Sequence, residues 1–256
     1  MLKRFFPASC AFLFPLGIAA TLCAQSPLRV AAAADLEPVL PPILAQFERE
    51  TGIHAETTYK ASAMLTTQIL NGAPFDLFLS ADLGYPRRLI AAGSADGPAP
   101  VTYAKGTLVL WERKGSHLPP PSLAFLRDPR LQRLAIASPE RAPYGRAAVA
   151  ALNNLKLYGA LKPRIVTAEN IAQAAQFADS GNADAGLISL TSALTPQLSS
   201  SGSYFVIPRD LYPPIEQGAV IVRASKQHAA AQRLLDFLLS APVQAELARS
   251  GLTPVR

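Results

Sequence analysis

Short apolar runs alternate with amphipathic stretches along most of the chain. The apolar runs have the length of buried strands, and the amphipathic stretches have helical spacing. Strands are predicted at residues 28–33, 53–59, 75–79, 106–111, 133–137, 164–166, 185–188, 204–207 and 219–222. Helices are predicted at residues 43–50, 63–70, 85–92, 121–126, 146–157, 171–180, 228–239 and 243–250.

This alternation predicts an α/β protein in which helices cover both faces of largely parallel sheets. The stops between elements are consistent with it, since Thr51-Gly52 is a typical C-terminal glycine cap. The proline run at 119–121 and the Ser-rich stretch at 199–203 are short loops. Two lobes formed by a chain that crosses between them produce such weak boundaries.

The first 24 residues have the pattern of a secretory signal peptide. A basic start at Lys3 and Arg4 precedes an apolar run at residues 5–20, and small residues follow up to a cleavage site near Ala24. We therefore expect an exported protein located in the periplasm.

Two alternatives to a cleaved leader are disfavoured. A membrane anchor needs about 20 apolar residues, whereas this run is shorter and is interrupted by Pro7 and Pro15. Lipid attachment at Cys23 is the other alternative, but Leu22 stands where a small residue is expected. Lipid anchoring stays open.

Composition narrows the function classes. Half of the 256 residues are apolar and 16% are charged, which excludes a disordered chain. The net charge of +6 suits nucleic acid, a membrane surface or an anionic ligand. Export, and basic runs no longer than Arg87-Arg88, argue against nucleic acid. Both cysteines lie within the leader, so the mature chain has no thiol chemistry.

Catalytic motifs are missing from the sequence. The three histidines, His54, His117 and His228, are too scattered for a metal cluster. No nucleophile elbow, dinucleotide fingerprint or phosphate-binding loop occurs. We therefore expect a binding protein without a cofactor. The alternative from another class is a secreted hydrolase that uses Ser62 or Tyr144, although neither has an obvious base beside it.

Four predicted helix starts carry groups that suit an anion. Ser62 and Asn170 are natural N-caps, Gly145 allows close backbone approach, and Asp35 follows the first strand. Free N–H groups and the positive end of the helix dipole make such turns anion sites. Taken singly, each of the four is also explained as an ordinary cap.

Several motifs, in order along the mature chain, resemble the periplasmic molybdate-binding proteins of ABC importers. They are VAAAADL (30–36), YKASAML (59–65), NGAPFDLFLSAD (71–82), SPERAPYGR (138–146), ENIAQAA (169–175), GNADAGLI (181–188), YPPIEQGAVIV (212–222) and FLLSAPVQAELARSG (237–251). The resemblance implies a two-lobed fold that holds a tetrahedral oxyanion in its cleft. It also implies a monomer that delivers the anion to a membrane permease with a cytoplasmic ATPase.

The resemblance implies a boundary for each lobe and a set of ligand-binding residues. Lobe I is expected at residues 27–108 plus 213–256, and lobe II at residues 109–212. Ser62 matches the binding serine, while Tyr144 and Ile171 match residues whose backbone amides bind the anion. The resemblance implies that the protein contacts only the oxygens of the molybdate anion and that no side chain binds the molybdenum atom directly.

Two positions depart from the family pattern. Asp35 stands where many members have serine, and Ser189 where many have an anion-binding tyrosine. A carboxylate near a dianion is repelled by about 4 kcal/mol per charge pair at about 4 Å and an effective dielectric of about 20. We therefore expect Asp35 to cap its own helix and leave amides near Ala34–Leu36 to the ligand. Ser189, a water or the phenol of Tyr144 would replace the missing hydroxyl.

Prolines near Asp35 complicate this expectation. Pro38, Pro41 and Pro42 lack N–H donors and make a regular helix unexpected before about residue 42.

The motifs are compatible with two interpretations of the ligand. Molybdate and tungstate are nearly isosteric, so the sequence does not rank them, whereas sulfate is smaller. The departures at Asp35 and Ser189 keep open a second interpretation, in which the same fold binds sulfate, phosphate or a small organic acid.

Overall fold

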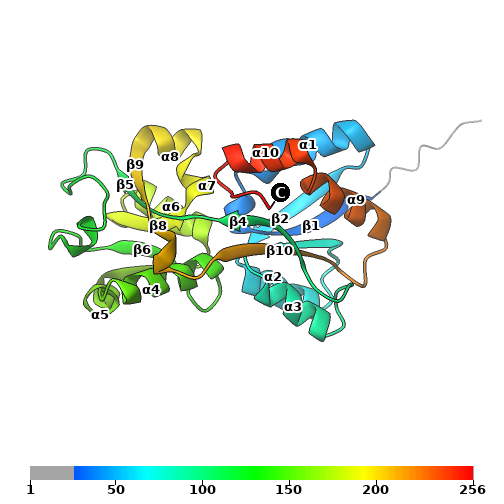
Figure 1. Cartoon of the computed structure of the whole chain (residues 1–256), viewed down its shortest axis with the longest axis horizontal. Coiled ribbons are helices and arrows are strands. Elements are labelled where there is room, and N and C mark those ends of the chain that lie inside the picture. Colours follow the sequence, from blue (N-terminus) through cyan, green and yellow to red (C-terminus); the bar gives the residue numbers. More distant parts are fainter. Residues whose placement is uncertain (1–25, 256) are drawn as a thin grey trace, which may run out of the picture.

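The computed structural model describes residues 26–255. The predicted signal peptide at residues 1–24, with Cys10 and Cys23, lies outside the described residues. The remaining chain forms two lobes that lie side by side, each built on one five-stranded sheet (Figure 1).

The two sheets have equivalent strand orders. Lobe I has the order β2-β1-β3-β10-β4, and its strands are β1 Leu28–Ala33, β2 Ala55–Lys60, β3 Leu77–Ser80, β4 Val101–Gly106 and β10 Ile215–Ile221. Lobe II has the order β7-β6-β8-β5-β9, and its strands are β5 Leu108–Arg113, β6 Leu134–Ala137, β7 Ile165–Ala168, β8 Ala185–Ser189 and β9 Gly202–Val206.

Each sheet is mostly parallel with one reversed strand. In lobe I, β1 pairs in parallel with β2 and β3, while β10 runs antiparallel to β3 and β4. In lobe II, β6 pairs in parallel with β7 and β8, while β5 runs antiparallel to β8 and β9. The predicted α/β class with largely parallel sheets is confirmed.

Helices cover both faces of each sheet (Figure 1). In lobe I these are α1 Leu40–Thr51, α2 Ser62–Leu70, α3 Gly84–Ala91, α9 His228–Leu238 and α10 Ala241–Arg249. In lobe II they are α4 Pro143–Asn154, α5 Tyr158–Leu161, α6 Ile171–Asp179, α7 Leu190–Ala193 and α8 Pro196–Ser201. Four 3-10 turns complete the described elements: η1 Ala34–Leu36, η2 Phe125–Arg127, η3 Lys162–Arg164 and η4 Arg209–Leu211.

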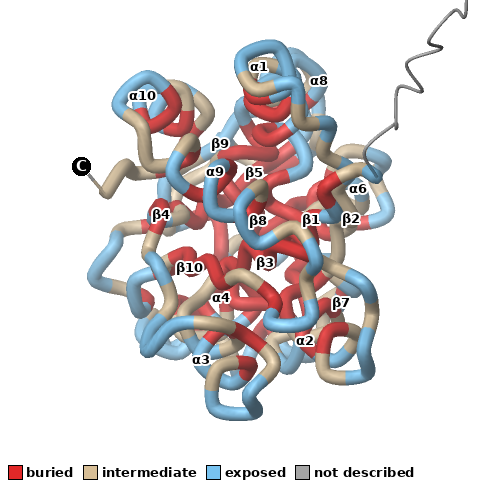
Figure 2. The backbone as a smooth tube through the Cα atoms, turned by 90° about the vertical axis from the view of Figure 1, so that its right-hand side faces the viewer, coloured by how far each residue is buried: buried red, intermediate tan, exposed pale blue. Residues whose placement is uncertain are grey.

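The buried residues follow the sheets through the middle of the molecule (Figure 2). Lobe I has two apolar clusters, one shared with α1, α9 and α10 and one shared with α2 and α3. The lobe II cluster reaches across the gap, because it includes Ala33, Ala34 and Ala81 of lobe I. Continuous packing at this point brings the ends of β1 and β3 against lobe II.

The chain crosses between the lobes twice. The first crossing joins β4 to β5 through Thr107, and the second joins β9 to β10 through residues 207–214. The crossings are tied together, because the Leu108 N–H donates to the Tyr212 hydroxyl at 3.1 Å. The boundaries expected for the lobes stay a prediction.

Several expected elements differ in the structure. The predicted helix at 121–126 is wrong, since only the short turn η2 forms there. Strand β4 and the short helices α5, α7 and α8 were not predicted. Helix α1 begins at Leu40, earlier than expected, because Pro41 and Pro42 fall in its first turn, where N–H groups have no helical partner.

Two expected helix ends are confirmed. Gly52 ends α1 with a φ of 72°, and its N–H donates to the Glu48 carbonyl at 2.8 Å. Asn170 caps α6 by accepting the Gln173 N–H at 2.9 Å. Within residues 26–255, no helix combines the length and apolar character that crossing a membrane requires.

Candidate functional site

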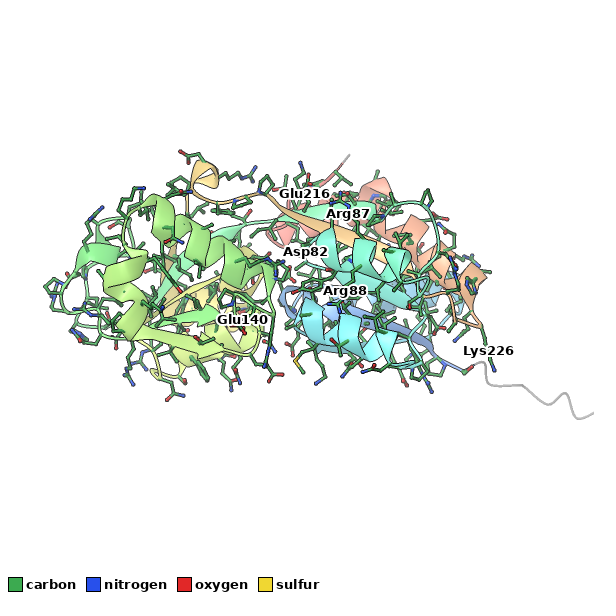
Figure 3. The ribbon with its side chains drawn as sticks, turned by 90° about the horizontal axis from the view of Figure 1, so that it is seen from below. Asp82, Arg87, Arg88, Glu140, Glu216 and Lys226 are labelled. Carbon is green, nitrogen blue, oxygen red and sulfur yellow. The ribbon has the colours of Figure 1, made fainter. Side chains whose placement is uncertain are left out.

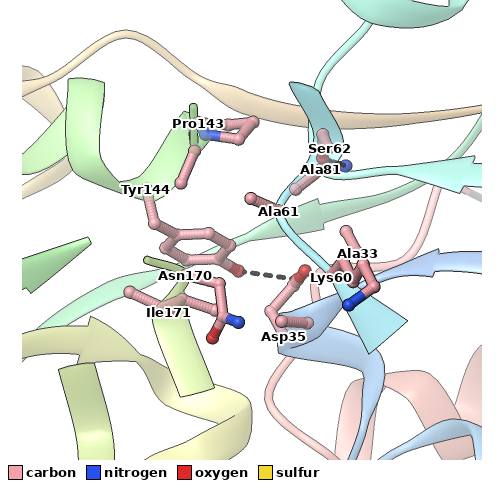
Figure 4. Close-up of a pocket in the computed structure, with 12 residues that line it drawn as sticks. Ala33, Asp35, Lys60, Ala61, Ser62, Ala81, Pro143, Tyr144, Asn170 and Ile171 are labelled. Atoms are coloured by element: carbon pink, nitrogen blue, oxygen red, sulfur yellow. Dashed lines mark hydrogen bonds between the residues drawn. The ribbon is translucent and has the colours of Figure 1, made fainter. Parts of the chain in front are cut away.

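A small cavity lies where the ends of strands from both sheets meet (Figure 4). Lobe I lines it with the last residues of β1 and β2 and with residues that follow β1, β2 and β3, and lobe II with residues at the starts of α4 and α6. The structure brings together Asp35, Ser62, Tyr144 and Ile171 there, but Ser189 does not line it. The cavity volume is about 10 Å³. A volume of this size holds about one water molecule, so the lobes must part for a larger solute to enter.

Ser62 supplies a hydroxyl from the first residue of α2. The expectation that it caps this helix is wrong: Ala61 occupies the cap position, and no side chain caps there. The Ser62 oxygen instead accepts the Ala81 N–H at 3.2 Å, and the side chain is buried. A hydroxyl that accepts one bond still has its proton to donate, so Ser62 can offer that proton to an anion.

Helices α4 and α6 point their N-terminal turns at the cavity. The predicted helix at 146–157 begins earlier, at Pro143, so Tyr144 lies in the first turn. Close packing at the end of β6 requires glycine next, because a β-carbon at Gly145 would lie 2.7 Å from the Ser138 carbonyl oxygen. The first N–H groups of both helices lack helical partners, and the helix dipoles favour negative charge.

Asp35 lies on the floor of this cavity. It is fully buried, and its Oδ2 accepts hydrogen bonds from the Tyr144 hydroxyl at 3.1 Å and from the Gln217 side-chain amide. The expectation that it caps its own helix is wrong, since η1 has Ala33 at its N-cap and no side-chain cap. Tertiary partners on α4 and β10 outcompete the local cap. Figure 4 shows the Asp35 side chain pointing toward the Tyr144 hydroxyl.

Burial changes the protonation of this pair. Desolvation raises the pKa of Asp35 from 3.8 to about 6, although the hydrogen bonds from Gln217 and Tyr144 act to lower it. Burial, together with the nearby Asp35 carboxyl, raises the pKa of Tyr144 well above its usual value. Tyr144 therefore remains a neutral hydroxyl donor, and the charge of Asp35 changes near neutral pH.

Ser189 lies at the end of β8, where it caps α7. Its oxygen accepts the Ser192 N–H at 3.2 Å and the Thr191 hydroxyl at 2.9 Å. The Thr191 hydroxyl also lies 2.7 Å from the Asp35 carbonyl oxygen. Ser189 is thus connected to the site through Thr191, and the phenol of Tyr144 is the aromatic hydroxyl that reaches Asp35.

Sequence reasoning missed Gln217 and Lys60. Gln217 is fully buried on β10. In the sequence it stands two residues before the predicted apolar strand at 219–222, and this polar residue beside an apolar run could have indicated a buried polar group. Lys60 ends β2 and lines the cavity with a half-buried side chain. Its position directly before the serine loop was the corresponding signal.

Exposed polar contacts join the lobes at the edge of the cavity. Arg146 on α4 forms an ion pair with Asp82, which follows β3 at the junction of the lobes (Figure 3). Its guanidinium donates to the Tyr85 hydroxyl at 3.2 Å and lies 5.4 Å from the centre of that ring. We call the contacts of Arg146 with Asp82 and Tyr85 the rim contacts. Because Arg146 belongs to lobe II and the other two residues to lobe I, these contacts require the lobes to be together.

The fold and the cavity define the class: a two-lobed protein that encloses a small solute between its lobes. The described residues contain no group of three or more metal-ligating side chains. The family comparison agrees with this class. The chain belongs to the bacterial extracellular solute-binding protein family, whose model matches residues 28–253.

Similar proteins cover nearly the whole described chain. The molybdate-binding protein ModA of Azotobacter vinelandii is 38% identical over 222 residues, which are 87% of this chain and 88% of that one. ModA of Rhodobacter capsulatus is 36% identical over 223 residues, 87% of this chain and 86% of that one. The solved periplasmic molybdate-binding protein of Azotobacter vinelandii superposes with a TM-score of 0.84 and 31% identity, covering 90% of this chain and 100% of that one.

Proposed function

We propose that this chain is a periplasmic binding protein that captures molybdate, and tungstate with it, for an ABC importer. The observation that carries the proposal is the convergence of Ser62 and the first turns of α4 and α6 on one small cavity. The identity of 36–38% to molybdate-binding proteins supports the choice of anion.

Neutral donors account for most of the binding in this proposal. The Ser62 hydroxyl and the first-turn amides of Tyr144 and Ile171 donate to oxygens of the anion. Each helix dipole adds about 0.3–1 kcal/mol when exposed and up to about 2 kcal/mol when partly buried. Lys60 at the cavity adds a positive charge. Several such donors together hold a dianion without a buried ion pair.

Anion size sets the selectivity. Molybdate and tungstate have nearly the same size and charge, so we propose that both bind. Sulfate has shorter bonds to oxygen and leaves donors at poor hydrogen-bond distance. Hydrogen phosphate carries a proton that faces donors rather than acceptors, which costs a hydrogen bond.

Transport follows from the opening and closing of the lobes. The anion enters between parted lobes, and the rim contacts form again as they close around it. The closed protein, a monomer, then presents one surface to a membrane permease that works with a cytoplasmic ATPase. No bond of the anion is made or broken, so the proposed protein is not an enzyme.

One observation favours a second ligand within the same fold. An ionised Asp35 accepts a hydrogen bond from an anion that carries a proton, such as hydrogen phosphate. A hydrolase that uses Ser62 or Tyr144 is the alternative from another class, although neither hydroxyl has a base hydrogen-bonded to it other than the Asp35 carboxyl beside Tyr144. Turnover of simple esters or phosphoesters that disappears in Ser62→Ala would support the hydrolase.

A thermal-shift titration with molybdate, tungstate, sulfate and phosphate tests the proposal. Ligand at about 100 times its Kd stabilises the protein by about 2.7 kcal/mol. For a protein of this size, that is a rise in Tm of roughly 5–10 °C. A rise with molybdate and tungstate alone supports the proposal. A rise with phosphate alone favours the second ligand, and no rise with any of the four overturns the oxyanion assignment.

A further inference from the structure

One of the residues that line the cavity, Asp35, carries a buried polar atom without a hydrogen-bond partner. Three buried side-chain atoms of the described residues have no hydrogen-bond partner: Asp35 Oδ1, Thr57 Oγ1 and Gln217 Oε1. Two of the three are the second oxygen of the Asp35 carboxyl and the oxygen of the Gln217 amide, whose other polar atoms bond to each other. A buried polar atom without a partner is costly, and Asp35 Oδ1 is the one of the three that belongs to a residue lining the cavity, where a ligand oxygen could pair with it if the carboxyl carries a proton.

The two oxygens of the Asp35 carboxyl have different surroundings. Oδ2 accepts from both the Tyr144 hydroxyl and the Gln217 amide, whereas Oδ1 accepts from neither. Because Oδ2 already receives two donors, a proton on this carboxyl belongs on Oδ1. A carboxyl protonated there becomes a hydrogen-bond donor at the cavity.

The groups that surround Asp35 do not compensate a negative charge well. Gln217 on β10 is neutral, as are the hydroxyls of Tyr144 on α4 and Tyr103 on β4, whose pKa values burial raises. The Thr191 hydroxyl bonds to the backbone carbonyl of Asp35 and not to its carboxyl. Lys60 at the end of β2 is the one cationic residue among those that line the cavity. An ionised Asp35 therefore repels a dianion, and a neutral Asp35 attracts it.

We propose that Asp35 binds the oxyanion as the neutral acid, donating its carboxyl proton from Oδ1 to a ligand oxygen, so that each binding event takes up one proton from solvent. This inference rests on the proposed function, because it requires a dianion in the cavity. It assigns the departure at Asp35 a role in recognition that the serine of the family pattern fulfils with its hydroxyl.

The pKa of the Asp35 carboxyl sets the pH range in which proton uptake on anion binding can be measured. With a pKa of about 6 while the lobes are together, Asp35 is mostly ionised above pH 7 when no anion is bound. A bound dianion raises that pKa further, since a nearby like charge favours the neutral acid. Affinity for the dianion therefore falls as the pH rises, by about tenfold per pH unit between the free and the bound pKa.

Calorimetry of molybdate binding tests the inference directly. Titrations at about pH 7.5 in buffers with different ionisation enthalpies count the protons exchanged. We expect uptake close to one proton and a Kd that weakens about tenfold per unit from about pH 6.5 to about pH 8.5. Proton uptake by the wild-type protein is measured without any variant, so this count does not depend on whether a variant folds.

Two substitutions assign the proton. Asp35→Asn supplies an N–H donor that needs no proton, so the uptake and the pH dependence should disappear while binding near pH 8.5 becomes at least several-fold tighter. Glu112→Gln is the matched control. Glu112 is also a buried carboxyl with a raised pKa, but it lies on β5 outside the cavity. This control should keep the wild-type proton uptake.

The outcomes separate the inference from the proposed function. Molybdate binding without proton uptake and with a flat pH profile overturns the inference and leaves the function intact. Uptake that persists in Asp35→Asn assigns the proton elsewhere and also overturns it. If molybdate does not bind to the wild-type protein at any pH, the proposed function fails and the inference fails with it.

Discussion

The two lobes share a strand order and a reversed fourth strand, yet they contribute different chemistry to the cavity. In both, the residues that follow the first two parallel strands line it. Lobe I offers side chains, the Asp35 carboxyl and the Ser62 hydroxyl. Lobe II offers backbone at the starts of α4 and α6, each a helix of nine residues or more.

The two lobes therefore differ in what determines the position and the properties of the groups at the cavity. The lobe II groups are fixed by packing, since the start of α4 lies directly against the end of β6 through Gly145. The lobe I groups depend on protonation and on distant hydrogen-bond partners. Substitutions in lobe II should therefore act through geometry, and substitutions in lobe I through charge and hydrogen bonding.

The largest effect is expected from Gly145→Ala in lobe II. The new β-carbon would overlap the Ala137 carbonyl oxygen, so α4 must shift away from β6. We expect a loss of about 3 kcal/mol in the free energy of unfolding. Affinity for molybdate should fall more than tenfold, measured by denaturant titration and calorimetry.

Gly159→Ala is the matched control in the next helix. A β-carbon at Gly159 has nothing within 4 Å, so this variant should be up to about 1 kcal/mol more stable than the wild type. Equal stability of the two variants would contradict the packing argument.

Asp35→Asn should alter stability with a defined pH dependence. A carboxyl whose pKa is raised from 3.8 to about 6 on folding destabilises the folded protein above that pH by about 3 kcal/mol. Below about pH 4 the wild-type penalty is absent, and it grows as the pH rises through about 6. The variant should therefore be more stable at pH 8 by about 2–3 kcal/mol, with the difference vanishing near pH 4.

Thermal unfolding without ligand from about pH 4 to about pH 8 measures this difference. A constant difference across that range would show that Asp35 does not titrate on folding as described.

Ser62→Ala should weaken molybdate binding by roughly 1–2 kcal/mol, about tenfold, because one donor to the anion is lost. Thr67→Ala in the same helix is the control, since its hydroxyl bonds only to the Ala63 carbonyl and is exposed. Calorimetry on both variants compares them. Unchanged affinity in Ser62→Ala would remove this hydroxyl from the site.

The rim contacts should have the smallest effect. Arg146→Ala removes an exposed ion pair, and such pairs contribute about 0–1 kcal/mol. We expect up to about fivefold faster ligand release with little change in association, measured by stopped-flow kinetics. Tyr85→Phe combined with Arg146→Ala should give less than the sum of the single effects. Strict additivity would show that the two side chains act separately.

The sequence predicts those features of the fold that depend on neighbouring residues. The strand and helix order follows from local apolar patterns, and the ends of α1 and α6 follow from Gly52 and Asn170. Strand β4 was missed because its pattern is weak: Lys105 and Thr102 interrupt it. Its pairing with β10 is a long-range contact that no local pattern contains.

In the site, too, the features that depend on neighbouring residues were predicted and those that depend on long-range contacts were not. Three helix starts that local residues and the resemblance predict to be anion sites do line one cavity, and their binding of an anion stays a prediction. The direction of the Asp35 side chain was not predicted, because its partners lie 109 and 182 residues away in the sequence. Ser62 looked like a cap because serine favours that position, whereas the Ala81 N–H from the end of β3 takes its oxygen.

The second crossing determines the order in which the lobes complete during synthesis. Strand β10 lies between β3 and β4 in lobe I, although it follows every strand of lobe II in the sequence. The ribosome therefore releases all five strands of lobe II before β4 receives its sheet partner. Lobe II can fold as a continuous segment, while lobe I waits for residues 215–221 and so reverses the usual N-terminal-first order. A ribosome stalled before β10 would hold a nascent chain with one finished sheet and one open one.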